Sequence, residues 1–218
     1  MDTLSPDAVA DIAPATLIPR GLSLLFVAVY PRIGEYVAVR IKNKVWQIGI
    51  TFGVSIGLWF VFALPLAIFE WNHLLIGIII YTLLAVMAHF LLQRKSQQKS
   101  IALTYTAGQK IARIAYAGCI VFLVTLFGKM LGPFWGGIFT MFPAAFSSLM
   151  MILHWYYGPQ NLFPTMQRVA VGSLSLFTYV ITAMLTFPAY GFVAGTAVAY
   201  TVSLATTILL LKGQRAPV

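Results

Sequence analysis

Long runs of residues without a charge alternate with short polar segments along this chain. Residues 45–69 and 71–93 contain no Asp, Glu, Lys or Arg. A transmembrane helix takes about 20 predominantly apolar residues, so each of these runs is long enough to cross a bilayer. The pattern therefore predicts membrane-spanning helices.

The remaining apolar runs extend this prediction to seven helices. They are residues 14–30, interrupted by Arg20; 114–131, with Lys129 near its end; 130–167, one span followed by a turn at 158–161; and 169–211. The last run is too long for one crossing, and Pro188 and Gly191 divide it into two helices. We expect an all-α, polytopic transmembrane helical bundle of about seven helices.

The composition supports a membrane protein. Charged residues make up 9% of the 218 residues, against about 25% in a typical soluble domain, and apolar residues make up 60%. A soluble enzyme, a nucleic-acid-binding protein and a disordered protein are excluded as descriptions of the whole chain, because so few charges cannot form a polar shell. The single cysteine, Cys119, excludes an intrachain disulfide and a zinc site built from cysteines.

The distribution of basic residues predicts that the N-terminus lies outside and the C-terminus inside. In this orientation only Arg20 and Lys129 lie outside, as the positive-inside rule favours. The cytoplasmic side receives Arg32, Arg40, Lys42, Lys44, Arg94, Lys95, Lys99, Lys110, Arg113, Arg168, Lys212 and Arg215. The basic loops should bind anionic lipid at the cytoplasmic face of the bilayer rather than nucleic acid.

The two halves of the chain indicate a partial internal repeat. At an offset of 124 residues the sequence matches Pro19 with Pro143, Ser23 with Ser147 and Gly34 with Gly158. We expect residues 1–93 to form a first, incomplete repeat (helices 1–3) and residues 94–113 a basic cytoplasmic linker. Residues 114–218 would hold the second repeat (helices 5–7) and an extra helix 4. The two copies would have the same orientation, as in parallel-repeat membrane folds.

The sequence indicates no catalytic, metal or cofactor site. Residues 53–57 read Gly-Val-Ser-Ile-Gly, the pattern of a nucleophile elbow, but that elbow needs a strand-to-helix turn and this segment lies within a span. We interpret it as a small-residue face for close helix packing. His73, His89 and His154 lack metal-ligand spacing and are expected at interfaces. No acidic residue lies deep in a span, so the usual carboxylate for proton or sodium coupling is missing.

Arg20 is the one charge expected well inside the first span. One interpretation is that its side chain extends to the outer interface or pairs with Glu70. The other is that Arg20, with Lys129, lines an outer vestibule, since ionisable residues inside a membrane commonly mark solute pathways.

The fifth predicted helix contains Gly136, Gly137 and Pro143, which weaken a helix. It is either a kinked, tightly packed helix or an interrupted span that lines a binding site. Pro143 has no N–H, so the Phe139 carbonyl would lose its helical partner. A hydroxyl or a solute would replace that partner, and Arg168 at the start of helix 6 would complete an anion seat. The candidate solute-lining set is Arg20, Gly136, Gly137, Thr140, Pro143, Ser147, His154 and Arg168.

A family resemblance rests on short motifs in the second half. Gly136-Gly137, Phe142-Pro143, His154-Trp155-Tyr156-Tyr157-Gly158, Arg168 and Gly172-Ser173-Leu174 resemble the pattern of small GlpM-like bacterial inner-membrane proteins. Those proteins have four helices, with a Phe-Pro helix and a His-Tyr-x-x-Gly exit. The resemblance covers about residues 109–211, and Trp155 directly after His154 departs from it. It implies an inner-membrane location and no particular substrate.

Two functions fit these observations. The first is a facilitator-type transporter or channel for a small polar or anionic solute, or for a lipid headgroup. The alternative is a non-transporting accessory or scaffold subunit of a larger membrane complex, or of a homo-oligomer. A carrier needs a polar path between the repeats, whereas a scaffold needs outward-facing small residues.

Overall fold

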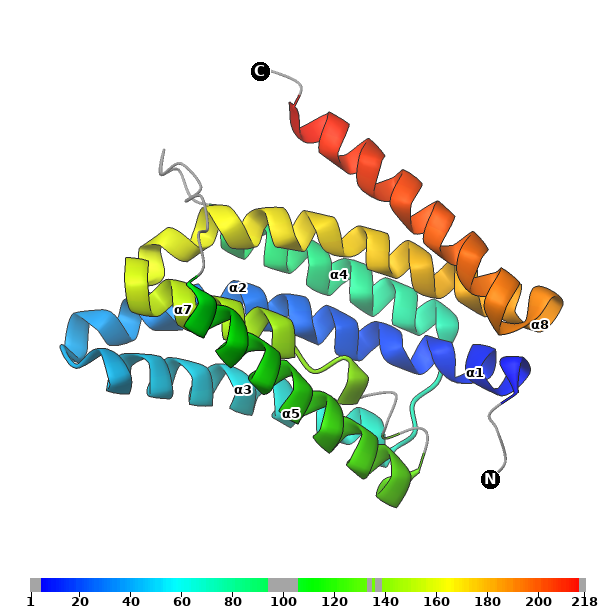
Figure 1. The fold of residues 1–218 in the computed structure, drawn as a ribbon, viewed down its shortest axis with the longest axis horizontal. Helices are drawn as coiled ribbons and strands as arrows, with labels where there is room; N and C mark the ends of the chain where they lie inside the picture. Colours follow the sequence, from blue (N-terminus) through cyan, green and yellow to red (C-terminus); the bar gives the residue numbers. More distant parts are fainter. Residues whose placement is uncertain (1–4, 94–105, 133–134, 136–138, 216–218) are drawn as a thin grey trace.

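The computed structural model describes residues 5–93, 106–132, 135 and 139–215, and the described residues are helical or lie in turns (Figure 1). The elements are α1 (Pro6–Ile12), the 3₁₀ turn η1 (Ala13–Thr16), α2 (Leu17–Arg40), α3 (Lys44–Ile68), α4 (Leu74–Leu92), α5 (Ala107–Leu131), α7 (Ala144–Tyr157), the 3₁₀ turn η2 (Pro159–Asn161) and α8 (Leu162–Arg215). The predicted all-α class is confirmed.

The first helical segment is longer than expected. The Ser5 side chain caps α1 by accepting a hydrogen bond from the Ala8 amide, and α1, η1 and α2 continue as one apolar segment from Pro6 to Arg40. The expected span of residues 14–30 is therefore wrong at both ends. The inner boundary fails because Pro31 lies within α2 and is buried there. Tertiary packing overrides the low helix propensity of proline at this position.

The core of the bundle is α2, which is more buried than any other long helix among the described residues. It packs against α3, α4, α7 and α8, and in Figure 1 α2, α3, α4 and the first half of α8 run roughly along the long axis of the molecule. The outer end of the bundle is defined here by the loop at residues 69–73, where Asn72 donates to the Asp11 carbonyl (2.6 Å). The inner end holds residues 41–43 and 158–161, where Lys44 donates to the Trp155 carbonyl (3.1 Å).

The long helix α8 is divided at Gly191, as predicted. Gly191 has φ 69° and ψ −179°, which interrupts the helix, and Pro188 precedes the break. The chain then folds back, so that Thr186 donates to the Gly195 carbonyl (3.2 Å) and Ser203 to the Ser175 carbonyl (2.8 Å). Beyond these contacts the C-terminal half of α8 diverges from the bundle (Figure 1).

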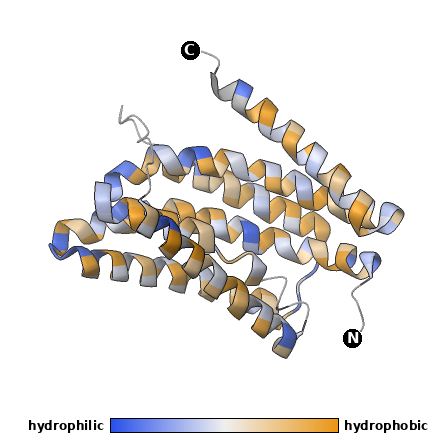
Figure 2. Ribbon diagram, viewed as in Figure 1, coloured by the Kyte–Doolittle hydropathy of each residue, from blue (hydrophilic) through white to orange (hydrophobic). Residues whose placement is uncertain are grey.

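Five helices among the described residues are long and apolar enough to cross a membrane: Pro6–Arg40, Lys44–Ile68, Leu74–Leu92, Ala107–Met130 and Pro159–Leu210. Figure 2 shows apolar residues along the length of the helices and hydrophilic ones mainly near the ends. This is the architecture of a multi-pass membrane protein. The expected count of seven spans differs because α7 has only 14 residues and α8 is one element with a break.

The start of α5 also differs from the prediction. A capping box between Thr106 and Gln109 begins this helix at Ala107, so residues 107–113 belong to α5 and not to a linker. The rest of the expected linker, residues 94–105, lies outside the described residues.

Candidate functional site

Arg20 joins three parts of the bundle. Its Nη1 donates to the Leu176 carbonyl on α8, and its Nη2 lies 3.3 Å from the Met141 sulfur, in the segment before α7. Its Nε is buried and has no hydrogen-bond partner. Both hydrogen-bond partners of Arg20 among the described residues are neutral, and neither is a carboxylate.

Arg20 lies deep in the bundle. At 1.5 Å per residue it is roughly 20 Å along the helix from Pro6. Two neighbouring side chains, Trp59 and Tyr81, lie about 10–15 Å from the outer ends of α3 and α4 by the same measure. Because the hydrocarbon core of a bilayer is about 30 Å thick, Arg20, Trp59 and Tyr81 fall near the middle of a membrane that these helices span.

The break before α7 brings Met141 to the level of Arg20. Pro143 has φ −77° and ψ 48°, and the Ala144 amide donates to the Phe142 carbonyl (2.8 Å), which is the geometry of an inverse γ-turn. The predicted distortion near Pro143 is therefore present. The expected vacancy at the Phe139 carbonyl is not, because that carbonyl accepts from the Phe142 amide (3.0 Å).

Further polar side chains, on α2 and α3, lie at the level of Arg20. The Ser23 hydroxyl lies against the carbonyls of Pro19 (3.1 Å) and Met141, and Trp59 donates its indole N–H to the Ser23 oxygen (3.1 Å). Trp59 is only 2% exposed, and its ring meets Phe142 edge-on at 5.5 Å. The hydrogen bonds hold the γ-turn segment against α2.

Tyr81 forms the α4 side of the layer. Its hydroxyl lies 3.4 Å from both the carbonyl and the hydroxyl of Ser173 on α8, and its ring stacks on Phe177 at 4.6 Å. Tyr81 is 1% exposed, so this hydroxyl is removed from solvent together with Ser173. We call Arg20, Ser23, Trp59, Tyr81 and Ser173 the Arg20 layer.

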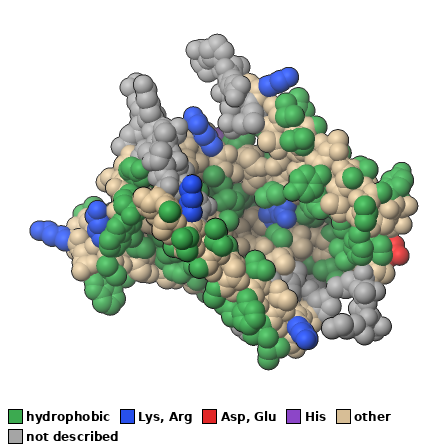
Figure 3. Space-filling view, in the orientation of Figure 1, with side chains coloured by type: hydrophobic (Ala, Val, Ile, Leu, Met, Phe, Trp, Pro, Cys, Tyr) green, Lys and Arg blue, Asp and Glu red, His purple; other side chains and the backbone are tan. Residues whose placement is uncertain are grey.

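One face of the molecule is hollowed. Figure 3 shows a depression in the face of the molecule between the regions that α8 and α5 occupy in Figure 1, with Lys or Arg atoms on its floor. A separate cavity of about 40 Å³ lies between α2 and α3. Its lining is apolar except for Ser55, whose buried hydroxyl has no partner.

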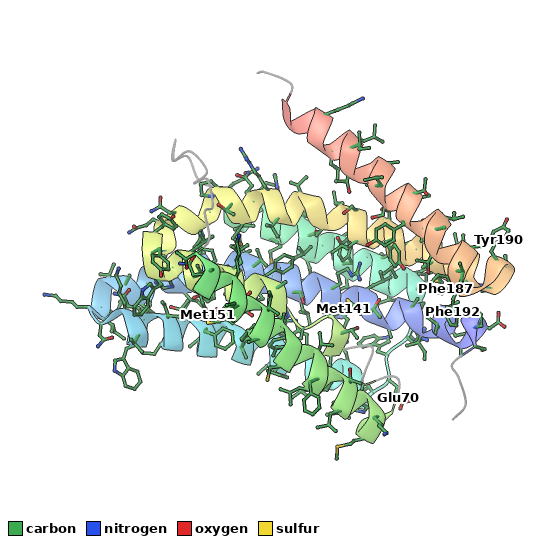
Figure 4. All side chains as sticks on the ribbon, viewed as in Figure 1. Glu70, Met141, Met151, Phe187, Tyr190 and Phe192 are labelled. Carbon is green, nitrogen blue, oxygen red and sulfur yellow. The ribbon has the colours of Figure 1, made fainter. Side chains whose placement is uncertain are left out.

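Pairing of Arg20 with Glu70 is not found. Glu70 is exposed, and Figure 4 shows it at the edge of the bundle, whereas Met141, the contact of Arg20, lies in the middle. Nor does the guanidinium extend to the outer interface, because it turns across the bundle to α8.

The other helix 5 candidates are placed as follows. Gly136 and Gly137 lie outside the described residues, and Thr140 is exposed. Pro143 is buried at the γ-turn. Ser147 is fully buried, and its hydroxyl contacts the Ala144 carbonyl (2.9 Å) and the Tyr116 hydroxyl (2.8 Å). The expected hydrogen bond from a hydroxyl such as Ser147 to the Phe139 carbonyl is therefore not formed, since the Phe142 amide donates to that carbonyl.

Arg168 does not form the expected anion seat. The helix begins at Leu162 rather than near residue 169, so Arg168 lies beyond the first turn, and its side chain is exposed. The positive end of a helix acts within its first turn, so Arg168 and that end do not converge on one site.

His154 is buried rather than interfacial. It is 2% exposed, its Nδ1 lies 3.4 Å from the Tyr30 hydroxyl, and its Nε2 has no partner. Gly34 permits this packing, because a Cβ there would lie 3.3 Å from His154 and 2.9 Å from Pro159. His154 thus belongs to the inner end of the bundle, about ten residues of α2 away from Arg20.

The small residues at 53–57 form no close-packing face against another helix among the described residues. Ser55 is buried, but a Cβ at Gly49, Gly53 or Gly57 would meet no atom within 4 Å. These glycines line an open face of α3. The remaining histidines, His73 and His89, lie at the two ends of α4. No group of three metal-binding side chains occurs among the described residues.

Comparisons with known proteins add no family: no family model matches the chain, and neither a curated protein nor a solved structure is significantly similar to it. The resemblance to GlpM-like proteins stays a prediction.

Sequence reasoning identified Arg20 and missed the rest of its layer. Ser23, Trp59 and Tyr81 are ordinary residues of apolar spans, and no local spacing links them. The available signal is depth: measured from the outer end of its helix, each lies between a third and a half of the helix length away, as Arg20 does when the helix begins at Pro6.

Proposed function

We propose that this protein is a facilitator-type transporter or channel for a small anion or an anionic headgroup, in which Arg20 is the binding group. The observation that carries the proposal is a half-buried guanidinium whose hydrogen-bond partners among the described residues are neutral and whose Nε has no partner. Ionisable residues inside a membrane are expensive and mark solute pathways, and arginine suits carboxylates and phosphates because its donors form a planar fork.

The absence of deep acids favours facilitation over coupled transport. The acidic residues of the described chain lie in α1, near the inner end of α2 and in the outer loop: Asp7, Asp11, Glu35 and Glu70. None shares the depth of Arg20, so no carboxylate is placed to carry a coupling proton or sodium ion.

Flux in proteoliposomes tests the proposal. Arg20→Gln should lower anion binding or flux about tenfold or more, because a charge-assisted hydrogen bond contributes roughly 1.5–3 kcal/mol. Arg20→Lys should retain part of the activity, and Arg168→Gln, an exposed arginine, should retain all of it. A folded Arg20→Gln protein with unchanged flux would refute the proposal.

We further propose that the two halves are parallel repeats related by an axis along the membrane normal, in a bacterial inner membrane. Tyr30 and His154, which correspond at the offset of 124 residues, contact each other. Residues that correspond under a two-fold axis meet only close to that axis. An experimental structure in which residues 17–91 fail to superpose on residues 141–215 would contradict the repeat.

The scaffold function has one observation in its favour. Gly49, Gly53 and Gly57 follow a four-residue spacing on the open face of α3, and small residues at this spacing let helices approach closely. Under this alternative, Gly53→Leu would disrupt association with another subunit while Arg20→Gln would have no effect. Under the transport proposal, Arg20→Gln lowers anion flux, and Gly53→Leu leaves that flux unchanged.

A further inference from the structure

The hollow between α8 and α5 opens sideways. The helices run along the long axis of the molecule, and the hollow in Figure 3 is seen at right angles to that axis. Helices that span a bilayer stand roughly along its normal, so this face is turned toward lipid and not toward either aqueous phase.

Arg20 connects α8, which borders this opening, with the segment before α7. It donates to the Leu176 carbonyl on α8 and lies against the Met141 sulfur before α7. Arg20 is half-buried rather than closed off, and the Leu176 side chain beside it is 48% exposed. A cation is therefore accessible from an apolar surface at the level of the hydrocarbon core.

The present partners of Arg20 leave room for a stronger one. A thioether sulfur is a weak acceptor, and the buried Nε has none. An anionic oxygen accepts shorter and stronger hydrogen bonds than a thioether does, and a guanidinium binds carboxylate and phosphate groups in pairs of parallel bonds.

We propose that the Arg20 layer binds the headgroup of an anionic amphiphile, which enters from the bilayer through the hollow and keeps its acyl chains in the lipid. This inference rests on the proposed function and names the substrate class. Charge complementarity selects an acidic headgroup, and the sideways opening selects a ligand that is already in the membrane over one dissolved in water.

Photocrosslinking of the full chain in a neutral detergent tests this. The probe is a phosphatidylglycerol with a diazirine at the first carbons of an acyl chain, followed by peptide mapping. Label is expected on the segments that contain Met141 and Leu176. Unlabelled phosphatidylglycerol should suppress it, whereas phosphatidylcholine with the same chains and water-soluble glycerol 3-phosphate should not.

Variants identify the group responsible. Arg20→Gln should reduce this labelling about tenfold or more, in line with the loss of charge-assisted hydrogen bonds. Arg20→Lys, which keeps the charge, should reduce it less and serves if the glutamine variant does not fold. Arg168→Gln, which changes an exposed arginine, should label like the unaltered protein.

Three outcomes overturn the inference. Equal suppression by phosphatidylcholine means ordinary boundary lipid, and label that is independent of Arg20 means another occupant of the hollow, such as a second copy. Suppression by glycerol 3-phosphate as strong as by phosphatidylglycerol means a soluble anion, which overturns the amphiphile but leaves the proposed transport function standing. Failure of that function shows instead as flux of every tested anion that does not depend on Arg20.

Discussion

Tyr30 and His154 meet edge-on at the inner end of the bundle, with their rings 5.9 Å apart at 88° and the Tyr30 hydroxyl 3.4 Å from His154 Nδ1. Tyr30 is fully buried on α2, and His154 lies in the last turn of α7. The contact joins residues that are 124 positions apart, and it fixes α7 to α2 one turn before the chain turns at Gly158.

This pair should show a measurable coupling. Tyr30→Phe removes the hydroxyl and keeps the ring, and His154→Phe removes the ring nitrogen that faces it. A double-mutant cycle on unfolding in detergent should give a coupling free energy of about 0.5–1.5 kcal/mol, the usual contribution of one hydrogen bond. Strictly additive effects of the two substitutions would show that the contact contributes nothing.

The hairpin in α8 depends on Gly195. A Cβ there would lie 2.7 Å from Cδ1 of Phe187 and 3.2 Å from the backbone of Thr186. Gly195→Ala should therefore lower the free energy of unfolding by about 1–3 kcal/mol through overpacking. Gly172→Ala in the same helix meets no atom within 4 Å and should stabilise by up to about 1 kcal/mol. Similar melting temperatures for both variants would contradict this packing.

Arg32 closes the inner end of α4. Its Nε and Nη2 donate to the Leu91 carbonyl at 3.1 and 2.8 Å, and its guanidinium lies 5.3 Å from the Phe163 ring centroid. Arg32→Gln should cost about 0.3–1 kcal/mol, since a cation at a helix C-terminus contributes in this range. Arg168→Gln is the matched control on an exposed arginine. Equal melting temperatures of the two variants would count against a capping role for Arg32.

The orientation in the membrane can be tested with single cysteines in a Cys119→Ser background. Asn72→Cys places a thiol in the outer loop, and Lys42→Cys and Asn161→Cys place thiols at the inner end. An impermeant maleimide added to intact cells should label only the first, because the basic residues predict the inner end to be cytoplasmic. Labelling of Asn72→Cys and Lys42→Cys from the same side would refute the topology.

The predicted helices came from apolar runs, and the errors arose where packing overrides local signals. The apolar run predicts that the first helix ends before Pro31, but α2 passes through this proline, and Pro31, Gly34 and Val37 are buried on it. The start of α5 was placed too late because Lys110 and Arg113 are charged, although the Thr106–Gln109 capping box was present in the sequence.

The candidate site was predicted less well, for a physical reason. Arg20 is recognisable alone, because a charge in an apolar run is costly. Its contacts are with the main chain of Leu176 and the sulfur of Met141, and neither a carbonyl nor a methionine in an apolar run signals a polar site. The anion-binding role expected for Arg168 depends on a helix that begins at that residue. The helix begins six residues earlier, at Leu162, and such boundaries are the least certain part of a sequence-based prediction.

The distance along the chain between Arg20 and its partners bears on how the protein is made. The carbonyl that Arg20 contacts belongs to a residue 156 positions later. At about 5–20 residues per second, the ribosome needs roughly 8–30 s to supply it. During that interval the first helix must hold an arginine in or near the bilayer without Met141 or Leu176. Biogenesis therefore requires a temporary partner for this charge, from the translocon, from water or from an acidic lipid, before the bundle assembles around it.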